Sequence, residues 1–315
     1  MPTPSEIESI RLFLKKGVIF VVPFLLYAAF LVVIDPFTYF NVSHVIDHEN
    51  KRETAGKLHY ALWKSLVFRH DPRPNVFFGD SRMALFRVSI AEELTGEPFY
   101  NFSYGAGTIP EMVDTFWFAD QHVELERVFF GIGIINYNVF QSMNRVVDSN
   151  AILGNPLLYL TNRIVSKAAF YAVAAQLTGS PADIEKPPLA QEAFWRYQLG
   201  EPTTANFGLY KRPTEYLARL REVAEYCAEQ GIAFTIVIPP SHVDLQAKVA
   251  EFDMQEEYDR FLEDMRSLGR VIDFNFPNPF TRDRANFSDP YHFQGANPRL
   301  VEAILSDAPD PTITR

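Results

Sequence analysis

This chain of 315 residues has almost no cysteine, and its basic residues are fewer than its acidic ones. It contains one cysteine, Cys227, which excludes an intramolecular disulfide and any metal site built from several thiolates. Lys and Arg together number 29 against 39 Asp and Glu, which gives a formal net charge of −10. Because binding to nucleic-acid phosphates needs concentrated Lys and Arg, this balance argues against a nucleic-acid partner.

Signals for a metal or a cofactor are also missing. His44 and His48 have the i, i+4 spacing of a helical metal pair, but no third ligand accompanies them. Gly131 and Gly133 begin a pattern like that of dinucleotide-binding loops, but Asn136 occupies the position of the third glycine. We therefore expect no metal and no cofactor.

One segment, residues 17–34, contains no charged side chain at all. At about 1.5 Å per residue in a helix, its length comes close to that of a hydrocarbon core of about 30 Å. Arg11, Lys15 and Lys16 precede it, whereas no Lys or Arg follows until Lys51. This asymmetry predicts a single transmembrane helix, with residues 1–16 in the cytoplasm and everything after about residue 40 outside. A cleavable signal peptide is the alternative.

The remaining chain, roughly 275 residues, is long enough to bury the core of one large domain. Along it, apolar runs of strand length alternate with longer segments of helical periodicity. Such alternation predicts an α/β fold with a mainly parallel sheet that helices cover on both faces. We predict strands near residues 75–79, 98–102, 127–135, 233–238 and 271–274, and helices near residues 83–94, 110–121, 213–230, 255–268 and 295–305.

Two stretches lie outside this alternation. Residues 35–72 are expected to form a membrane-proximal segment that is helical around residues 54–68. Residues 140–212 are expected to form an insertion, in which residues 156–177 are apolar on most faces and residues 180–188 and 200–206 have the composition of loops. The apolar part is interpreted either as a helix packed on the domain, or as a lid or a surface that rests on the bilayer or on an integral-membrane partner.

Gly79-Asp80-Ser81 follows the apolar run 75–78 and is the first motif with chemical content. Gly79 permits a tight turn, and a helical pattern begins at Met83, which predicts that Ser81 lies between a strand and a helix N-terminus. Backbone N–H groups there can stabilise an anion, so Ser81 is a candidate nucleophile and its own N–H a candidate oxyanion donor. The alternative is that Asp80 and Ser81 only cap the helix.

A second motif with chemical content, Asp289-Pro290-Tyr291-His292, lies near the other end of the chain. A serine hydroxyl needs an imidazole to accept its proton and a third group to orient the imidazole. The i, i+3 spacing brings Asp289 and His292 to one side of a turn, where the carboxylate can fix the imidazole tautomer. By itself the motif also suits an N-cap followed by proline at the first helical position. Together with Ser81, it predicts a triad of Ser81, His292 and Asp289.

The predicted topology places several polar residues at one edge of the sheet. The carboxyl ends of parallel strands share an edge, and active sites of open parallel sheets lie there. The loops after the first three predicted strands carry Ser81, then Gly105 and Gly107, then Asn136.

Two further residues are candidate substrate contacts. His242 follows the strand 233–238 at the same edge, where it either contacts substrate or caps a turn. Arg82 directly follows Ser81 and either contacts an anionic or glycan substrate or is solvated on the surface of a helix.

The motifs at Ser81 and at Asp289 resemble those of the SGNH hydrolases, over roughly residues 73–306. In that family the nucleophile lies in a Gly-Asp-Ser block and the acid–base pair in a late Asp-x-x-His block. The resemblance implies a flavodoxin-like SGNH domain, followed here by a tail at residues 307–315. It also implies an oxyanion hole that is completed by a glycine, either Gly105 or Gly107, and by Asn136.

The third family block, Gly-x-Asn-Asp, is irregular in this chain. Asn136 stands one residue late after Gly133, and Tyr137 replaces the aspartate. This departure leaves open an alternative function, that of an accessory subunit with a decayed site in an acyltransferase complex.

The membrane segment and the Gly-Asp-Ser-Arg form of the first block resemble one branch of the family. Its members act beside acyl-transfer machinery in bacterial polysaccharide O-acetylation or teichoic-acid D-alanylation. The resemblance implies a serine esterase or O-acyltransferase that acts on acyl esters, with acetyl as the expected acyl group, of a cell-envelope polysaccharide outside the bacterial cytoplasmic membrane. It implies as partners an acylated glycan or acyl donor and a membrane-bound O-acyltransferase.

Overall fold

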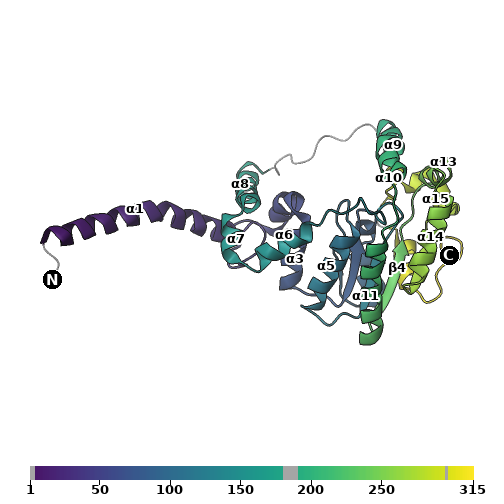
Figure 1. The fold of residues 1–315 in the computed structure, drawn as a ribbon, viewed down its shortest axis with the longest axis horizontal. Coiled ribbons are helices and arrows are strands. Elements are labelled where there is room, and N and C mark those ends of the chain that lie inside the picture. Colours follow the sequence, from purple (N-terminus) through teal and green to yellow (C-terminus); the bar gives the residue numbers. More distant parts are fainter. Residues whose placement is uncertain (1–3, 180–190, 295–296) are drawn as a thin grey trace. The chain divides into compact units, whose positions relative to one another are not determined.

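The computed structural model describes residues 4–179, 191–294 and 297–315 (Figure 1). The chain forms two compact units. We call them the helical unit, residues 1–67 with 150–185, and the sheet unit, residues 68–149 with 186–315. The stretch 140–212, expected to be one insertion, is divided between these units.

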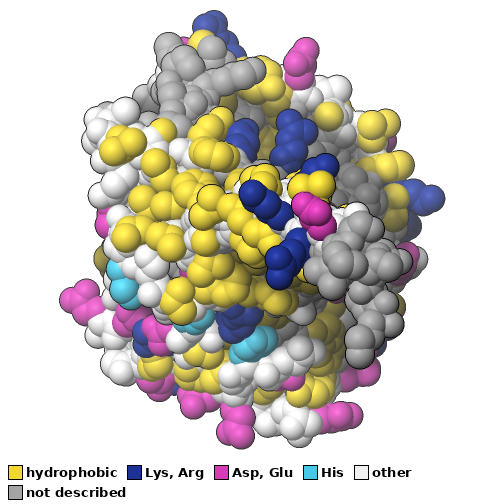
Figure 2. All heavy atoms as spheres, turned by 90° about the vertical axis from the view of Figure 1, so that its left-hand side faces the viewer, with side chains coloured by type: hydrophobic (Ala, Val, Ile, Leu, Met, Phe, Trp, Pro, Cys, Tyr) yellow, Lys and Arg dark blue, Asp and Glu magenta, His cyan; other side chains and the backbone are white. Residues whose placement is uncertain are grey.

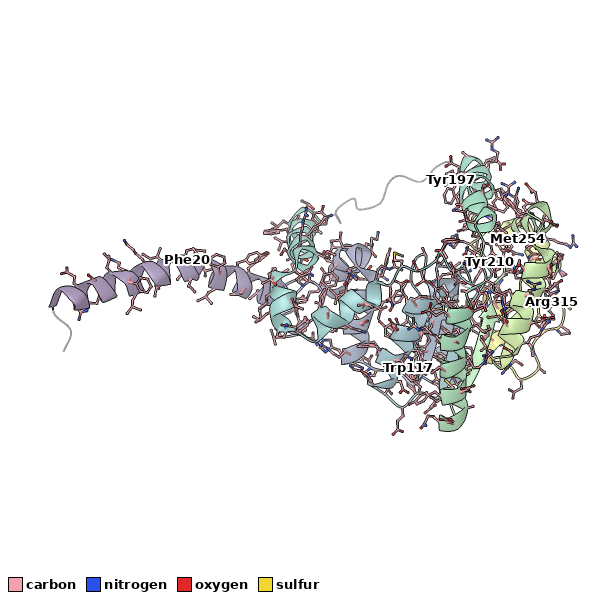
Figure 3. All side chains as sticks on the ribbon, in the orientation of Figure 1. Phe20, Trp117, Tyr197, Tyr210, Met254 and Arg315 are labelled. Atoms are coloured by element: carbon pink, nitrogen blue, oxygen red, sulfur yellow. The ribbon has the colours of Figure 1, made fainter. Side chains whose placement is uncertain are left out.

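The helical unit begins with α1 (Pro4–Ile34), which contains the segment expected to cross a membrane. Its stretch Arg11–Ile34 is long and apolar enough to do so, and a signal sequence would pass the same test. Phe20 points away from the helix axis and is 69% exposed (Figure 3). Large hydrophobic side chains are exposed along α1, and hydrophobic side chains gather in the middle of the view that looks at the protein from the side of α1 (Figure 2).

A buried carboxylate ends α1. Asp35 adopts a left-handed conformation with φ 42°, at the position after a helix where glycine is usual. Its carboxylate accepts hydrogen bonds from the N–H groups of Tyr39, Phe40 and Asn41, at 2.8, 3.0 and 2.7 Å. The hydroxyl of Tyr159 donates a fourth at 2.9 Å, so the chain is turned by contacts that compensate for the missing glycine.

The rest of the helical unit packs short helices against the end of α1. The predicted helix at 54–68 is divided by a π-helical turn, and the predicted apolar helix at 156–177 is divided at Asn162, which caps α8. The elements are α2 (His48–Lys51), the π-helical turn Arg52–Gly56, α3 (Tyr60–His70), α7 (Pro156–Thr161) and α8 (Arg163–Thr178). Helix α3 continues into the sheet unit.

Five parallel strands form the sheet, in the order β2-β1-β3-β4-β5. The predicted α/β fold is confirmed. The strands are β1 (Asn75–Gly79), β2 (Phe99–Asn101), β3 (Arg127–Gly131), β4 (Ala233–Ile238) and β5 (Arg270–Asp273). The connecting and covering helices are α4 (Val88–Thr95), α5 (Ile109–Asp120), α11 (Thr214–Gln230), α14 (Gln255–Arg266) and α16 (Pro298–Leu305). Helix α6 (Arg145–Leu153) continues from the sheet unit into the helical unit.

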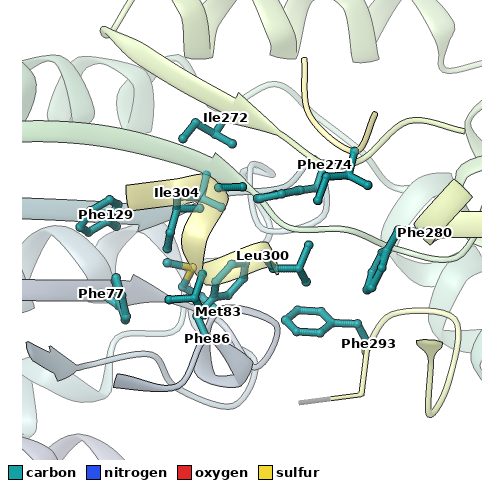
Figure 4. Close-up of a cluster of buried hydrophobic side chains, with 14 of the residues drawn as sticks. Phe77, Met83, Phe86, Phe129, Ile272, Phe274, Phe280, Phe293, Leu300 and Ile304 are labelled. Atoms are coloured by element: carbon teal, nitrogen blue, oxygen red, sulfur yellow. The ribbon is translucent and has the colours of Figure 1, made fainter. Parts of the chain in front are cut away.

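Side-chain alternation along β1 and β3 divides the core into two layers. Phe77 and Phe129 point to one face, where they join a buried cluster with side chains of α4 and α16 (Figure 4). Phe78 and Phe130 point to the other face, and their rings contact Phe116 of α5. Helix α11 lies beside α5 along the sheet (Figure 1). Both faces are therefore covered, as the apolar strands require.

The helix predicted at 83–94 is wrong in one respect, because two elements occupy this stretch. A 3-10 turn, Met83–Leu85, is followed by α4 only after a break. Phe86 is extended at the break and is buried in the core cluster. The amide of Asn101 donates to the carbonyl oxygens of Met83 and Phe86, both at 3.1 Å. Burial of Phe86 and capture of these carbonyl groups stop the helix.

The third strand is shorter than the predicted 127–135, since β3 ends at Gly131. The side-chain oxygen of Asn136 accepts the N–H of Gly133 at 2.8 Å, and the N–H of Tyr137 donates to the Gly133 carbonyl at 3.0 Å. These bonds close a turn where the apolar composition suggested continued strand.

Residues 200–206, expected to be a loop, instead form most of α10 (Glu201–Gly208). Pro202 lies in the first turn, where a missing N–H costs no helical hydrogen bond. The loop predicted at 180–188 lies outside the described residues. The remaining short elements are α9 (Gln191–Leu199), α12 (Val243–Gln246), α13 (Lys248–Glu251), α15 (Pro279–Arg282) and the 3-10 turn Arg284–Asn286.

Cys227 on α11 is fully buried. Burial, with the nearby Asp120 carboxylate, raises the pKa of its thiol to about 12. At pH 8 the thiol therefore stays protonated, and since the thiolate is the nucleophile it should not react with maleimide in the folded protein. We expect less than one tenth of the chain to be alkylated in detergent at pH 8 and stoichiometric alkylation in 6 M guanidinium. Stoichiometric alkylation of folded protein would contradict this burial.

Candidate active site

Ser81 lies two residues beyond β1, at the carboxyl edge of the sheet. The N–H of Ala84 donates to the Asp80 carbonyl at 3.1 Å, so the chain makes one turn before the 3-10 turn Met83–Leu85. The long helix expected to start here is absent from this described stretch, and its N-terminus is replaced by that turn. No acceptor for the Ser81 N–H occurs among the described residues, which leaves this donor available to a bound anion.

A continuous hydrogen-bonded chain joins the three predicted triad residues. Ser81 Oγ lies 2.7 Å from His292 Nε2, and His292 Nδ1 lies 2.8 Å from Asp289 Oδ2. Asp289 is 5% exposed, whereas the imidazole is partly open to solvent. With the Nδ1 proton held by the carboxylate, Nε2 is left as the acceptor for the serine proton.

The turn that carries His292 is held by its own backbone. Asp289 Oδ1 accepts the N–H groups of Tyr291 and His292 at 2.8 and 3.1 Å, so one carboxylate shapes the turn and orients the ring. An antiparallel bridge between Phe287 and Phe293 closes the turn, and both rings are buried in the core cluster. Residues 289–292 form this turn and not the first turn of a helix, so the N-cap alternative for Asp289 is wrong.

The two glycines of the second loop differ in position. A Cβ on Gly107 would lie 2.4 Å from the Gly79 carbonyl oxygen, so only glycine fits against the end of β1. Gly105 is exposed and has nothing within 4 Å of such a Cβ. Gly107 also lines the cavity at Ser81. The structure thus places Gly107 at the site, although its N–H donates to the Tyr104 carbonyl at 3.1 Å.

Asn136 reaches the site from the turn after β3. It is 4% exposed, and its Oδ1 is occupied by the Gly133 N–H. Its Nδ2 donates to Asp80 Oδ2 at a long 3.4 Å, which leaves the second Nδ2 proton for the cavity that Asn136 lines. An amide in this position can donate to a developing oxyanion.

Arg82 lines the cavity at Ser81 and is 5% exposed, so the alternative of a solvated helix surface is wrong, whereas a contact with substrate stays a prediction. Its guanidinium pairs with both carboxylate oxygens of Asp80: Nε lies 3.1 and 3.0 Å from Oδ1 and Oδ2, and an Nη lies 2.5 Å from Oδ2. A Cβ on Gly133 would lie 2.6 Å from the guanidinium, so a larger residue there would have to displace the Arg82 side chain. The pair brackets Ser81 and fixes its backbone.

His242 does not line the cavity at Ser81. It is 5% exposed, and its Nδ1 accepts the N–H of Asp244, which caps α12. Burial lowers the pKa of His242, which favours the neutral ring that this cap needs. Its backbone N–H donates to the Pro290 carbonyl at 2.9 Å, so His242 holds the turn 289–292 through the backbone.

The cavity at Ser81 has a volume of about 180 Å³. Its wall also contains three polar residues that the sequence analysis did not single out: Gln141, Asn206 and Tyr291. Gln141 Nε2 donates to Asn206 Oδ1 at 3.3 Å, and the hydroxyl of Tyr291 lies 2.8 Å from that of Thr203, outside the wall. Tyr291 could have been noticed within its motif, whereas Gln141 and Asn206 are brought here only by the path of the insertion. Among the described residues, no cluster of three or more His, Cys, Asp or Glu could hold a metal ion.

No known protein family and no curated protein matches the sequence. One solved structure that the chain resembles is described as "a putative platelet activating factor from Streptococcus pneumonia". The sequence identity is 12%, the alignment covers 79% of this chain and 90% of that one, and the TM-score is 0.39. The interpretation of the site therefore rests on its own geometry.

The buried ion pair predicts a stability effect that separates support from substrate contact. Arg82→Ala leaves the Asp80 carboxylate buried without its partner and should lower the free energy of unfolding by about 3–5 kcal/mol. Urea unfolding of the full chain in detergent measures this. Arg87→Ala is the matched control, because Arg87 is exposed and its loss should cost at most about 0.5 kcal/mol. Equal stability of the two variants would show that Arg82 has no structural role.

Proposed function

We propose that this protein is a serine esterase or O-acyltransferase of the SGNH type. The observation that carries the proposal is the hydrogen-bonded chain from Ser81 through His292 to Asp289, at 2.7 and 2.8 Å. A hydroxyl, a partly exposed imidazole and a buried carboxylate in this order are the parts of a nucleophilic serine mechanism.

In the first half-reaction Ser81 Oγ attacks the acyl carbonyl while its proton passes to His292 Nε2. Asp289 stabilises the resulting imidazolium through Nδ1. The Ser81 N–H and Asn136 Nδ2 donate to the oxyanion, and the Gly107 N–H adds a third donor if it leaves the Tyr104 carbonyl. The tetrahedral intermediate collapses to an acyl-serine, and His292 returns its proton to the departing alcohol.

In the second half-reaction a new oxygen nucleophile gives its proton to His292 and attacks the acyl-serine. Water gives hydrolysis, whereas a hydroxyl of a glycan gives transfer. Both reactions end with the proton back on Ser81 Oγ. They need the same triad and differ only in which acceptor the open side of the cavity admits.

The cavity supports a small acyl group and a hydroxyl-rich acceptor. Its volume of about 180 Å³ suits an acetyl group better than a long acyl chain. The side chains of Asn136, Gln141, Asn206 and Tyr291 offer amide and hydroxyl groups to sugar hydroxyls. We therefore assign acetyl transfer or removal on a cell-envelope polysaccharide as the reaction.

We further propose that α1 is a retained membrane anchor. Arg11, Lys15 and Lys16 would keep residues 1–16 in the cytoplasm, with the span at 17–34. The membrane-proximal segment 35–72, the catalytic domain 73–306 with its insertion, and the tail would then lie outside a bacterial cytoplasmic membrane. A membrane-bound O-acyltransferase is the partner that this location suits.

An accessory subunit with a weakened site is the second candidate function. One observation favours it: the Gly107 N–H, expected in the oxyanion hole, donates to the Tyr104 carbonyl. Such a subunit would organise an acyltransferase complex without forming an acyl-serine.

A serine-directed fluorophosphonate probe tests the nucleophile. It should label the wild-type chain, and Ser81→Ala should abolish the labelling and lower esterase turnover by several orders of magnitude while the fold is kept. Ser241→Ala is the matched control, since Ser241 is a buried serine that follows β4 and bonds Asn275. It should keep the labelling. Equal labelling of Ser81→Ala and wild type would refute Ser81 as the reactive serine.

Asp289→Asn tests the orienting carboxylate. An asparagine can still accept the turn N–H groups through Oδ1, but its NH₂ would face Nδ1 and hold the imidazole in the wrong tautomer. Turnover of a model acetyl ester should fall roughly 10⁴-fold at nearly unchanged stability. Asp283→Asn is the control: Asp283 is exposed and caps the 3-10 turn Arg284–Asn286, a role that asparagine fills equally well.

The double variants add a second measurement. Because the triad acts as a unit, combining Ser81→Ala with His292→Ala should cost little more than either change alone. Near-normal turnover in both Asp289→Asn and His292→Ala would leave the accessory subunit as the function.

A further inference from the structure

Helix α8 exposes one face that combines large apolar and basic side chains. Phe170 and Leu177 are 57% and 81% exposed, one heptad apart. Arg163, one heptad before Phe170, and Lys167 are exposed on the same side. The opposite face is buried and consists of small residues: Val165, Ala168, Ala169, Ala172 and Ala175. Large apolar groups thus face outward and small ones inward, which is the reverse of a helix that only covers a core.

The same unit fixes α8 beside the end of α1. The hydroxyl of Tyr27 on α1 donates to Ser166 Oγ, and the Phe30 and Phe170 ring centroids are 5.3 Å apart. The buried bond from Tyr159 of α7 to Asp35 holds the point where α1 ends. The level of α7 and α8 relative to α1 is therefore set by direct contacts.

If α1 spans a membrane, the contacts between α1 and α8 lie near the outer end of the span, so this inference rests on the proposed anchor. Tyr27 lies seven residues before Ile34, which is about 10 Å along a helix. If the span ends near Ile34, the Tyr27 partner Ser166 lies about 10 Å and the Phe30 partner Phe170 about 6 Å inside that end. These depths match the roughly 5–10 Å to which the apolar face of an interfacial helix is buried. On α7, Leu157 and Leu158 are also exposed, by 70% and 45%.

The charges of α7 and α8 favour lipid over a protein partner. In a chain with a net charge of −10, residues 156–178 contain no Asp or Glu and two cations, Arg163 and Lys167. Lys167 Nζ lies 5.2 Å from the centroid of the Tyr171 ring. Basic and aromatic side chains at the ends of an apolar surface are typical of helices that lie in the headgroup region of an anionic leaflet.

We infer that α7 and α8 lie in the plane of the membrane, with the outward face of α8 inserted among anionic lipids. The protein then contacts the bilayer twice, through the span of α1 and through this lateral surface.

Site-directed spin labelling of the full chain tests the inference. In a Cys227→Ala background, single cysteines at Phe170→Cys and Leu177→Cys are labelled, and the protein is purified and reconstituted alone in phosphatidylethanolamine and phosphatidylglycerol vesicles. Leu25→Cys reports on the span. Leu209→Cys is the matched control, since Leu209 is 65% exposed in the sheet unit. Accessibility to oxygen and to a nickel chelate is measured for each label.

Labels at 170, 177 and 25 should be more accessible to oxygen, and at least several-fold less accessible to the nickel chelate, than the label at 209. Lipid-like values at 25 with water-like values at 170 and 177 would overturn the lateral contact, keep the anchor and point to a protein partner. Water-like values at all three would overturn both. Leu177 makes the result independent of the Phe30 contact, and the readout does not depend on whether Ser81 is catalytic.

Discussion

The buried pair of Asp80 and Arg82 is the interaction on which the site depends. It stands on either side of the candidate nucleophile, so the backbone of Ser81 is held by two residues whose charges satisfy each other. The guanidinium lies against Gly133 just after β3, and Asn136 reaches the same carboxylate from the following turn. Burying both charges is worthwhile only with such complete pairing, because either one alone would be strongly destabilising. The pair therefore ties the ends of β1 and β3 into one preorganised edge.

Much of the fold could be predicted because its signals are local. The strands at β1, β2, β4 and β5 appear as short apolar runs, and α5, α11 and α14 as periodic segments within one or two residues of their bounds. The pairing of Ser81 with His292 was predicted from chemistry, since a serine nucleophile needs an imidazole to accept its proton. Asp289 could be paired with His292 from the i, i+3 spacing alone.

Other features depend on partners that are distant in sequence. The break at Phe86 is set by Asn101 and by the core cluster, neither of which a helical pattern near residue 86 reveals. For Arg82 the helical pattern of its neighbours suggested a solvated surface as the alternative to a substrate contact, whereas the residue is buried in an ion pair with the carboxylate of Asp80. The choice between Gly105 and Gly107 needed the approach of the Gly79 carbonyl. Gln141 and Asn206 meet only because the insertion returns to the sheet unit.

The bridge between Phe287 and Phe293 couples the opening of the turn 289–292 to the unfolding of the sheet unit. These rings flank the turn of His292 and belong to the same cluster as Phe77 and Phe129 in the middle of the sheet. Loops that bear catalytic groups are often the first parts to open, at a free energy well below that of global unfolding. Here the backbone turn that carries His292 is anchored by two buried rings, so opening the turn also exposes those rings. We therefore expect the amide hydrogens of this turn to exchange about as slowly as those of the central strands, and the arrangement of Ser81, His292 and Asp289 to persist until the sheet unit unfolds.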